Sequence, residues 1–362
     1  MSGCALVPLY TSVGRCYGND AMLKSSDTLA PGSNLVTPYH EMSHRAQLHR
    51  EHNIAEAALA RYRIREARLT LLTHNFNTVY RVDSAAGRFV LRIQEPNTLD
   101  APTIGSELAW LAALRHDTDL AVPQPLPNDA GELLTALQPQ GMPPRHIALF
   151  RWMDGQIVGK ATTPARLFKV GMLMATLHRH AQSFIPPSPF TRPRWDWARM
   201  FGAGSVFGSG RIDPLLADED RPAFAEASAV VRRAMEELGE GSEAFGLIHS
   251  DLHSWNYLYQ RGEIKAIDFE ICGWGHWILD LAVTIEALAG PRKAAMRDAF
   301  LSGYTSVRPL PAGFEQHERA FLLARLACFT NWVIESNNPK MKERAARSVA
   351  RLAEDIRQII AE

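Results

Sequence analysis

The character of this chain changes once, near residue 155, and that change limits the folds open to it. The β-rich runs before it alternate with polar turns and are Leu69–Leu72, Thr78–Val82, Arg88–Ile93, Glu132–Leu137 and His146–Trp152. The stretches after it have helical periodicity or composition and are 163–180, 222–238, 277–288, 293–307, 314–335 and 340–361. Only residues 256–267 interrupt those helices with β-rich sequence. The pattern predicts an α+β chain: a small antiparallel sheet domain, then a larger and mainly helical one.

The same pattern divides the chain into four segments. Residues 1–35 mix Gly, Ser, Pro and Thr without periodicity, so we expect a disordered N-terminal extension. Residues 36–68 are expected to form a helical lead-in. A small N-terminal lobe is expected at 69–154 and a C-terminal lobe at 155–362, with Gly155 as a hinge between them.

Two local signals refine the first lobe. The sequence Asp83–Gly87 is typical of a hairpin loop between two strands. Residues 106–114 are helical by period, and either Ser106 or Thr103 is expected to cap that helix.

Composition and charge exclude several classes of protein. Lys plus Arg and Asp plus Glu both number 39, so the chain lacks the positive field that general nucleic-acid binding requires. The 4 cysteines form no CxxC pair, which argues against a zinc or thioredoxin-type site. No apolar run approaches the roughly 18 residues of a membrane span. We therefore expect a cytoplasmic protein with no nucleic-acid or membrane partner.

The β-rich island in the helical half carries the chemistry. Arg261-Gly262 predicts a tight hairpin turn. Counting back from this turn places Asn256 opposite Ile267, one residue before Asp268. The intervening predicted pairs are Gln260 with Glu263 and Tyr257 with Ala266. An amide oxygen and a carboxylate then meet at the open end of the hairpin, and hard oxygen ligands of this kind suit Mg²⁺.

Asp251 lies five residues before Asn256, on the loop that leads into the hairpin. From there its carboxylate can point to the same place without binding the metal. A base at that position would orient a hydroxyl for attack on a phosphate. The alternative is that such Asp and Asn residues are ordinary turn and cap residues, which is their usual role when taken singly.

The order of these residues resembles a known family. His249-x-Asp251-x4-Asn256, followed by the Asp268-Phe pair, looks like the catalytic and metal-binding motifs of the aminoglycoside phosphotransferase family. That family includes choline, ethanolamine and homoserine-kinase-like enzymes and has the two-lobed protein-kinase-like fold. The resemblance in order and topology covers roughly residues 69 to 335.

The resemblance implies a role for each residue of the C-terminal lobe motif. Asp251 would be the catalytic base, and Asn256 and Asp268 would hold Mg²⁺ in an ATP-dependent kinase. Asp280 resembles the helix aspartate that hydrogen-bonds the backbone of the catalytic loop. His249 resembles the loop histidine with a structural role.

The resemblance also extends to the nucleotide-binding N-terminal lobe. Arg92 stands where the family has its phosphate-binding lysine, Glu107 resembles its helix partner, and Asn75 lies in the 73–77 turn expected to cover the phosphates. Arginine can bind phosphate through two N–H groups at once, so arginine at this position is compatible with ATP binding. The turn has no glycine where one is usual, and Ser250 stands where the family often has Gly. Arg92–Glu107 could instead be an ordinary surface ion pair.

The sequence indicates less about the acceptor site than about the phosphate-binding residues. Trp195, Asp196 and Trp197 could line a pocket for a cationic amine, or could equally be packing residues. Glu270 follows the Asp-Phe pair as in choline-kinase-like relatives and would lie near the metal, and Trp274 would border the acceptor. We expect a small hydroxylated acceptor: an amino alcohol, an amino acid, a sugar or an aminoglycoside-like compound.

Two other functions fit the same fold. Only 11 residues separate Asp268 from Asp280, which leaves no long activation segment and argues against an ordinary protein kinase, although a Ser/Thr kinase of this family stays open. A catalytically inactive nucleotide-binding protein is the other alternative. The sequence does not determine the oligomeric state or whether the nucleotide is ATP or GTP.

Overall fold

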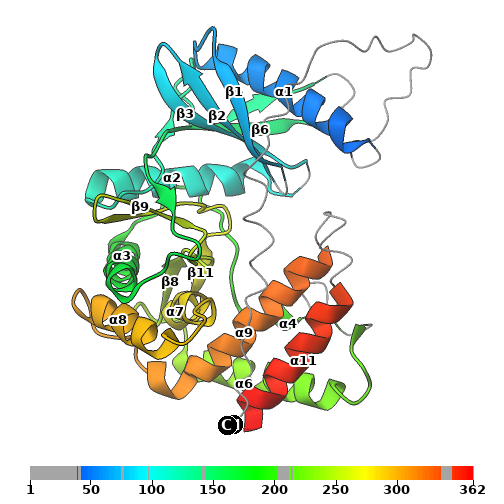
Figure 1. Cartoon of the computed structure of the whole chain (residues 1–362), viewed down its shortest axis with the longest axis vertical. Helices are drawn as coiled ribbons and strands as arrows, with labels where there is room; N and C mark the ends of the chain where they lie inside the picture. The colour runs from blue at the N-terminus through cyan, green and yellow to red at the C-terminus, as the bar shows by residue number, and fades with distance from the viewer. Residues whose placement is uncertain are drawn as a thin grey trace. The chain divides into compact units, whose positions relative to one another are not determined.

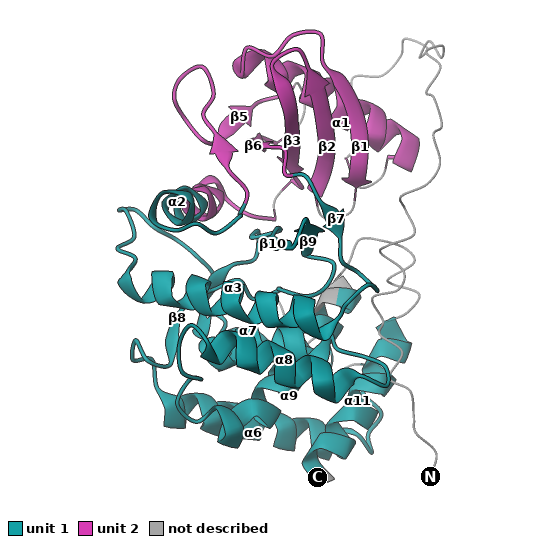
Figure 2. Ribbon diagram, turned by 60° about the vertical axis from the view of Figure 1, so that its left-hand side comes forward, with its two compact units in different colours: residues 1–8, 109–122, 154–362 teal, residues 9–108, 123–153 magenta. Residues whose placement is uncertain are grey.

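The computed structural model describes residues 39, 42–74, 77–96, 98–139, 143–202, 212, 215–335 and 345–361. The expected disorder of 1–35 and the expected role of Asn75 lie outside these residues. The chain forms two compact units (Figure 2). We call them the sheet unit, which holds the described residues up to 108 and 123–153, and the helical unit, which holds 109–122 and the chain from 154 onward.

The sheet unit contains one antiparallel sheet in the order β1-β2-β3-β6-β4, with β5 paired to β6. Its strands are β1 Arg68–His74, β2 Asn77–Ser84, β3 Gly87–Gln94, β4 Pro125–Leu126, β5 Thr135–Leu137 and β6 Arg145–Arg151. The expected β-rich runs all form strands. The hairpin between β2 and β3 turns at the predicted place, where Gly87 has a φ of 124° that favours glycine.

Helix α1 (His44–Arg61) covers this sheet and supplies a third of the buried residues of its core. Ser43 caps the helix by accepting a hydrogen bond from the backbone N–H of Ala46. Its buried side of Ile54, Ala55, Ala58 and Leu59 packs with Tyr80, Val82, Leu91 and other strand residues. A fully buried Ile or Leu side chain contributes about 1.5–3 kcal/mol to folding, so this cluster holds the lead-in helix against the strands.

Helix α2 (Ala101–Asp117) begins earlier than expected, and the predicted cap was wrong. The N–H of Thr103 donates to Oδ1 of Asp100 at 2.9 Å, so Asp100 caps the helix. Ser106 lies within the first turns instead, and its hydroxyl donates to the carbonyl of Pro102. Because the residues around Asp100 lack apolar periodicity, periodicity alone placed the start too late.

The helical unit contains seven of the described helices (Figure 1). They are α3 Pro164–Ser183, α4 Trp197–Phe201, α6 Arg221–Leu238, α7 Trp277–Glu286, α8 Lys293–Thr305, α9 Phe314–Glu335 and α11 Ala345–Ala361. Helices α3 and α8 approach closely because both carry glycine at the contact. A Cβ on Gly303 would lie 1.8 Å from the carbonyl oxygen of Phe168, so only glycine permits this packing.

Short strands line the same unit. The predicted hairpin forms from β9 (Tyr257–Gln260) and β10 (Glu263–Ala266), and β7 (Gln156–Ile157) joins β9. A second ribbon pairs β8 (Phe245–Ile248) with β11 (Gly273–His276). The expectation of a single β-rich stretch in this half was therefore wrong. The missed strands are two to four residues long, and their partners are distant in sequence, so local pattern does not reveal them.

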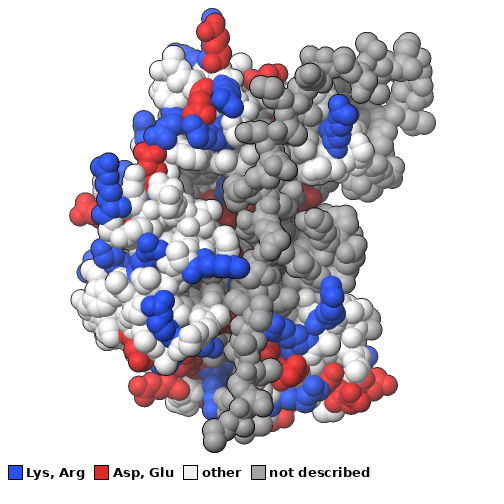
Figure 3. All heavy atoms as spheres, viewed as in Figure 1, with Lys and Arg blue, Asp and Glu red and all other residues white. Residues whose placement is uncertain are grey.

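The described surface mixes charges of both signs. On the face drawn in Figure 3, basic and acidic side chains are interspersed over the visible residues, in keeping with 39 of each in the whole sequence. Among the described helices, none is both long and apolar enough to cross a membrane.

Candidate active site

The β9–β10 hairpin brings the two predicted metal ligands to one end. Its register pairs Gln260 with Glu263 and Tyr257 with Ala266, as predicted. The N–H of Ile267 then donates to the carbonyl oxygen of Asn256 at 2.9 Å, directly before Asp268. The register prediction is confirmed. It could be made from sequence because a tight local turn fixes which residues pair on either side of it.

Asn256 is oriented by the carboxylate that we expect to be the base. Its Nδ2 donates to Oδ2 of Asp251 and to the backbone carbonyl of Asp251, both at 2.9 Å. With the amide nitrogen used in this way, Oδ1 of Asn256 is the atom suited to a cation. Asp268 has an exposed carboxylate on a backbone with φ of 68°. The pair offers the hard oxygen atoms that a divalent cation takes, so the residues present fit a Mg²⁺ ion.

The Asp251 carboxylate is partly buried and closely surrounded by cationic or polar groups. Its Oδ1 accepts a hydrogen bond from Nη2 of Arg325 at 2.9 Å, and its Oδ2 lies 3.3 Å from Nε2 of His253. The side chain keeps 23 % of its surface exposed. Burial by itself raises the pKa of Asp251, but the charges and hydrogen bond of His253 and Arg325 outweigh it and hold the pKa well below its usual range.

The buried Asp280 holds the backbone of the loop that carries Asp251. Asp280 accepts hydrogen bonds from the backbone N–H groups of His249 at 3.0 Å and Ser250 at 2.7 Å. Its Oδ2 also accepts from Nε2 of the fully buried His178, whose Nδ1 is hydrogen-bonded to the hydroxyl of Tyr304. These are the backbone contacts that the resemblance implied for Asp280.

His249 and Ser250 complete this support. Nε2 of the buried His249 donates to the carbonyl of Ile267, while its Nδ1 accepts from the N–H of Asp251. Burial lowers the pKa of His249 and so favours this neutral form. Ser250 has a φ of 67°, a conformation that favours glycine, and its hydroxyl donates to the carbonyl of Ile271 at 2.7 Å.

The sheet unit holds the other predicted site residues. Nη1 and Nη2 of Arg92 donate to the two carboxylate oxygens of Glu107 at 2.8 and 2.7 Å. The side chains are only 9 % and 1 % exposed, so this is a buried bidentate pair and not a surface ion pair. Arg92 pairs with Val79 across the sheet. Its contact with phosphate stays a prediction.

The structure brings two acceptor candidates together. The N–H of Trp195 donates to the carbonyl of Trp274 at 2.7 Å, and the indole N–H of Trp195 donates to the carbonyl of Ile271. That carbonyl also accepts the Ser250 hydroxyl, which links Trp195 to the loop of Asp251. Trp195 is only 4 % exposed.

Asp196 caps a helix, and Glu270 is contacted through its backbone carbonyl. Asp196 caps α4 by accepting from the N–H of Arg199 at 2.9 Å. The carbonyl of Glu270 accepts from the guanidinium of Arg192. The guanidinium of Arg199 lies 5.5 Å from the Trp195 ring centroid, so a cation already stands over this indole.

Three residues at the site were missed by sequence reasoning: Arg325, Arg192 and His178. Arg325 is the only charged residue in the run from Ala320 to Phe329, and that isolation is a signal that could have singled it out. Arg192, whose Nε donates to the carbonyl of Cys272 at 2.6 Å, and His178 carry no comparable signal.

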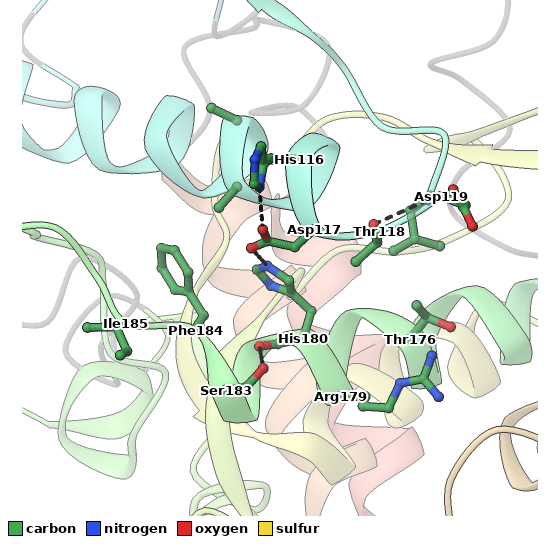
Figure 4. A pocket seen from close by; sticks show the side chains of 13 residues that line it. His116, Asp117, Thr118, Asp119, Thr176, Arg179, His180, Ser183, Phe184 and Ile185 are labelled. Atoms are coloured by element: carbon green, nitrogen blue, oxygen red, sulfur yellow. Dashed lines mark hydrogen bonds and ion pairs between the residues drawn. The ribbon is translucent and has the colours of Figure 1, made fainter.

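A separate cavity lies between the end of α2 and α3, and its volume is about 1030 Å³. Figure 4 shows Asp117 between two histidines there, with His116 2.7 Å and His180 3.0 Å from its carboxylate oxygens. The hydrogen bonds of these histidines lower the pKa of Asp117. The indole N–H of Trp110 donates to His180, and the Trp110 ring packs edge-on against Phe269, the residue after Asp268.

Comparisons with known proteins identify a family and several related kinases. Residues 69–322 match the phosphotransferase enzyme family. A homoserine kinase of Neisseria meningitidis serogroup B is 26 % identical over 267 residues, covering 71 % of this chain and 78 % of that protein. An amicoumacin kinase of Bacillus subtilis is 23 % identical, covering 66 % and 68 % respectively.

Solved structures show the same fold. A microcompartment-associated aminopropanol kinase superposes with a TM-score of 0.76 at 28 % identity, covering 85 % of this chain and 97 % of that one. The amicoumacin kinase hAmiN, solved with AMP-PNP, Ca²⁺ and amicoumacin, has a TM-score of 0.71 at 18 % identity, covering 86 % and 96 %. The expected α+β, protein-kinase-like fold is confirmed. Because the family match spans most of its length, this chain belongs to the phosphotransferase enzyme family and is a kinase that acts on a small molecule.

Proposed function

We propose that this kinase uses ATP and Mg²⁺ to phosphorylate a hydroxyl group of a small metabolite, with Asp251 as the catalytic base. The observation that carries the proposal is the hydrogen bond between Asp251 and Asn256 at the open end of the hairpin. With this contact made, the Asp251 carboxylate can accept a proton and Oδ1 of Asn256 can bind a cation.

In this mechanism Asp251 accepts the proton of the acceptor hydroxyl. The hydroxyl oxygen forms a bond to the γ-phosphorus of ATP, and the bond between that phosphorus and the bridging oxygen of ADP breaks. The low pKa keeps Asp251 ionised but makes it a weak base. A weak base suffices, because phosphoryl transfer depends mainly on positioning and on neutralising charge. A bound Mg²⁺ would neutralise phosphate charge.

The residues of the sheet unit would act on the nucleotide. Glu107 holds the Arg92 guanidinium in a fixed orientation, and a fixed guanidinium suits a phosphate oxygen. Asn75 belongs to the turn proposed to cover the phosphates. The relatives support a nucleotide and a divalent cation, since hAmiN was solved with AMP-PNP and Ca²⁺. Their names also bracket the acceptor, from amino alcohol to amino acid.

The first test measures binding of Mg-ATP by calorimetry and release of ADP in an acceptor screen. Asp268→Asn should abolish the Mg²⁺-dependent part of nucleotide binding, because it removes the charged ligand without changing its shape. Asp251→Asn should keep Mg-ATP binding but lower kcat by about 10²- to 10⁴-fold, the usual contribution of a general base. Asp218→Asn, whose side chain is fully exposed, is the matched control and should behave as wild type.

The outcomes separate this proposal from its alternatives. Turnover unaffected by Asp251→Asn would remove the base from this residue. Wild type that binds Mg-ATP but phosphorylates no acceptor would favour a nucleotide-binding protein without activity. Phosphorylation of a protein Ser or Thr in preference to every small acceptor would favour the protein-kinase alternative.

A further inference from the structure

The buried Arg192 holds the backbone of the turn that follows Asp268. Its Nε donates to the carbonyl of Cys272 at 2.6 Å, and its Nη2 donates to the carbonyl of Glu270. The residue is only 5 % exposed. A guanidinium presents its N–H groups in a rigid planar fork, so two carbonyls bound to one fork are fixed relative to each other.

Trp195, three residues further along the same segment, holds the carbonyl between these two. Its indole N–H donates to the carbonyl of Ile271 at 3.0 Å. The backbone of this segment also pairs with the chain beyond the turn. The N–H of Trp274 donates to the carbonyl of Pro193 at 2.8 Å, and the N–H of Trp195 donates to the carbonyl of Trp274 at 2.7 Å. The carbonyls of residues 270–272 are thus all held from one segment, the one that leads into α4.

The carbonyl of Ile271 has a second donor, which comes from the loop of the proposed base. The hydroxyl of Ser250 donates to it at 2.7 Å. Ser250 is one residue before Asp251, and Ile271 lies three residues after Asp268. One carbonyl oxygen therefore connects the turn of the charged metal ligand to the loop of the base. A shift of this turn would change the separation of the two carboxylates.

The backbone at Asp268 needs support of this kind. Its φ of 68° is unfavourable for a residue with a Cβ, and such conformations persist only where the surrounding contacts impose them. The ring of Phe269 packs against the ring of His249, with 4.5 Å between the centroids, and the N–H of Cys272 donates to the carbonyl of Phe269 at 2.9 Å. Arg192 holds the two ends of the same turn, so it helps to fix the backbone from which the Asp268 carboxylate projects.

We propose that Arg192 is a positioning residue for phosphoryl transfer. By holding the turn after Asp268, it sets the place of the metal-binding carboxylate relative to the base, Asp251. Arg192 acts through the backbone and not by contact with the reactants. The inference rests on the proposed function, because it needs Asp268 to bind Mg²⁺.

The test measures ATP binding by calorimetry, with and without the metal. Arg192→Met keeps an unbranched side chain but has no donor. In excess Mg²⁺ its Kd for ATP should be about 10- to 100-fold higher than that of wild type, the usual cost of removing a partner that orients a metal ligand. In EDTA the two proteins should bind ATP alike, because the metal site then contributes nothing. Arg192→Lys keeps the charge without the planar fork and should fall between them.

Turnover should report the same defect. The Mg²⁺ concentration for half-maximal turnover should rise in Arg192→Met by about the same factor of 10 to 100. Trp195→Phe removes the indole N–H and keeps a ring, and it should shift the Mg²⁺ dependence in the same direction but by less, because Ser250 still donates to Ile271. If Arg192→Met does not fold, Arg192→Lys and Trp195→Phe decide the question.

Calorimetry separates this role from a purely structural one. Unfolded protein lowers the number of binding sites per chain, whereas a displaced metal ligand lowers the affinity of the sites that remain. Arg115→Met is the matched control, because the exposed Arg115 also donates to a backbone carbonyl, that of Leu120, and should keep the wild-type Kd in both conditions. A wild-type Kd in Mg²⁺ for Arg192→Met would overturn the inference. So would an equal loss of affinity in Mg²⁺ and in EDTA, since that loss would not act through the metal site.

Failure of the proposed function gives a different result. In that case Asp268→Asn binds Mg-ATP as wild type does, whatever Arg192→Met shows. If Asp268→Asn loses the Mg²⁺-dependent part of binding while Arg192→Met keeps it, only the positioning inference fails.

Discussion

The carboxylate of Asp280 accepts a hydrogen bond from the imidazole of His178 at 3.0 Å, and neither side chain is exposed to solvent. The histidine comes from α3 and the aspartate from α7, 102 residues apart. Burial lowers the pKa of His178, so the ring is neutral and donates through Nε2. This pair anchors the backbone of the loop that carries Asp251.

Asp280→Asn should therefore destabilise the protein and slow turnover together. One oxygen of Asp280 serves two donors, and an amide group at this place would turn an N–H toward at least one of them. We expect a loss of about 3–5 kcal/mol in the free energy of unfolding, measured with urea. Asp218→Asn should change it by less than about 1 kcal/mol, because that side chain is exposed. Equal stability of the two variants would contradict this role for Asp280.

Acid should also weaken this anchor. Burial raises the pKa of Asp280, but the hydrogen bond and charge of His178, with the backbone donors, outweigh it and lower the pKa. A depressed pKa stabilises the fold above the unfolded pKa, and that contribution is lost as pH falls through the folded pKa. Wild type should hence lose stability below about pH 4, near the ordinary pKa of Asp, and Asp280→Asn should show a smaller loss over the same range.

The pH profile of turnover should respond to Arg325. The charges of His253 and Arg325 hold the pKa of Asp251 low, so wild type should show no acid limb from this group between about pH 5 and 8. Removing one of those charges in Arg325→Met raises the pKa, and the acid limb of kcat should move to higher pH. An unshifted profile would show that Arg325 does not act on the base in the working enzyme.

Ser250 offers a measure of backbone strain in the same loop. Its φ of 67° disfavours every residue that has a Cβ, while its hydroxyl donates to Ile271. Ser250→Gly and Ser250→Ala both remove the hydrogen bond, but only glycine relieves the strain. Ser250→Gly should be more stable than Ser250→Ala by about 1–2 kcal/mol in urea unfolding. Equal stabilities would mean that the loop relaxes to another conformation.

The buried pair of the sheet unit allows stability and nucleotide binding to be separated. Arg92→Met alone leaves the Glu107 carboxylate buried and unpaired, at a cost of about 3–5 kcal/mol. The double variant Arg92→Met/Glu107→Leu should recover most of that stability. Its affinity for Mg-ATP should stay low if Arg92 contacts phosphate. Recovery of both stability and affinity would assign Arg92 a purely structural role.

The sequence by itself determined those features that depend on local order. The β9–β10 hairpin formed in the predicted register because the Arg261-Gly262 turn fixes the pairing of the residues on either side of it. With the register fixed, Asn256 had to lie opposite Ile267, beside Asp268. The α+β division also followed from sequence, since most of the longer helices and strands show a helical or β-rich pattern of their own.

Only the tertiary structure decided what surrounds the base. Strands β8 and β11, the His178 anchor and Arg325 all come from segments far apart in sequence, and no local pattern encodes which of them meet. The order of the motif residues singles out Asp251, but only the packing of α9 places a guanidinium on its carboxylate. Long-range packing sets the charge around this group, and that charge holds its pKa low.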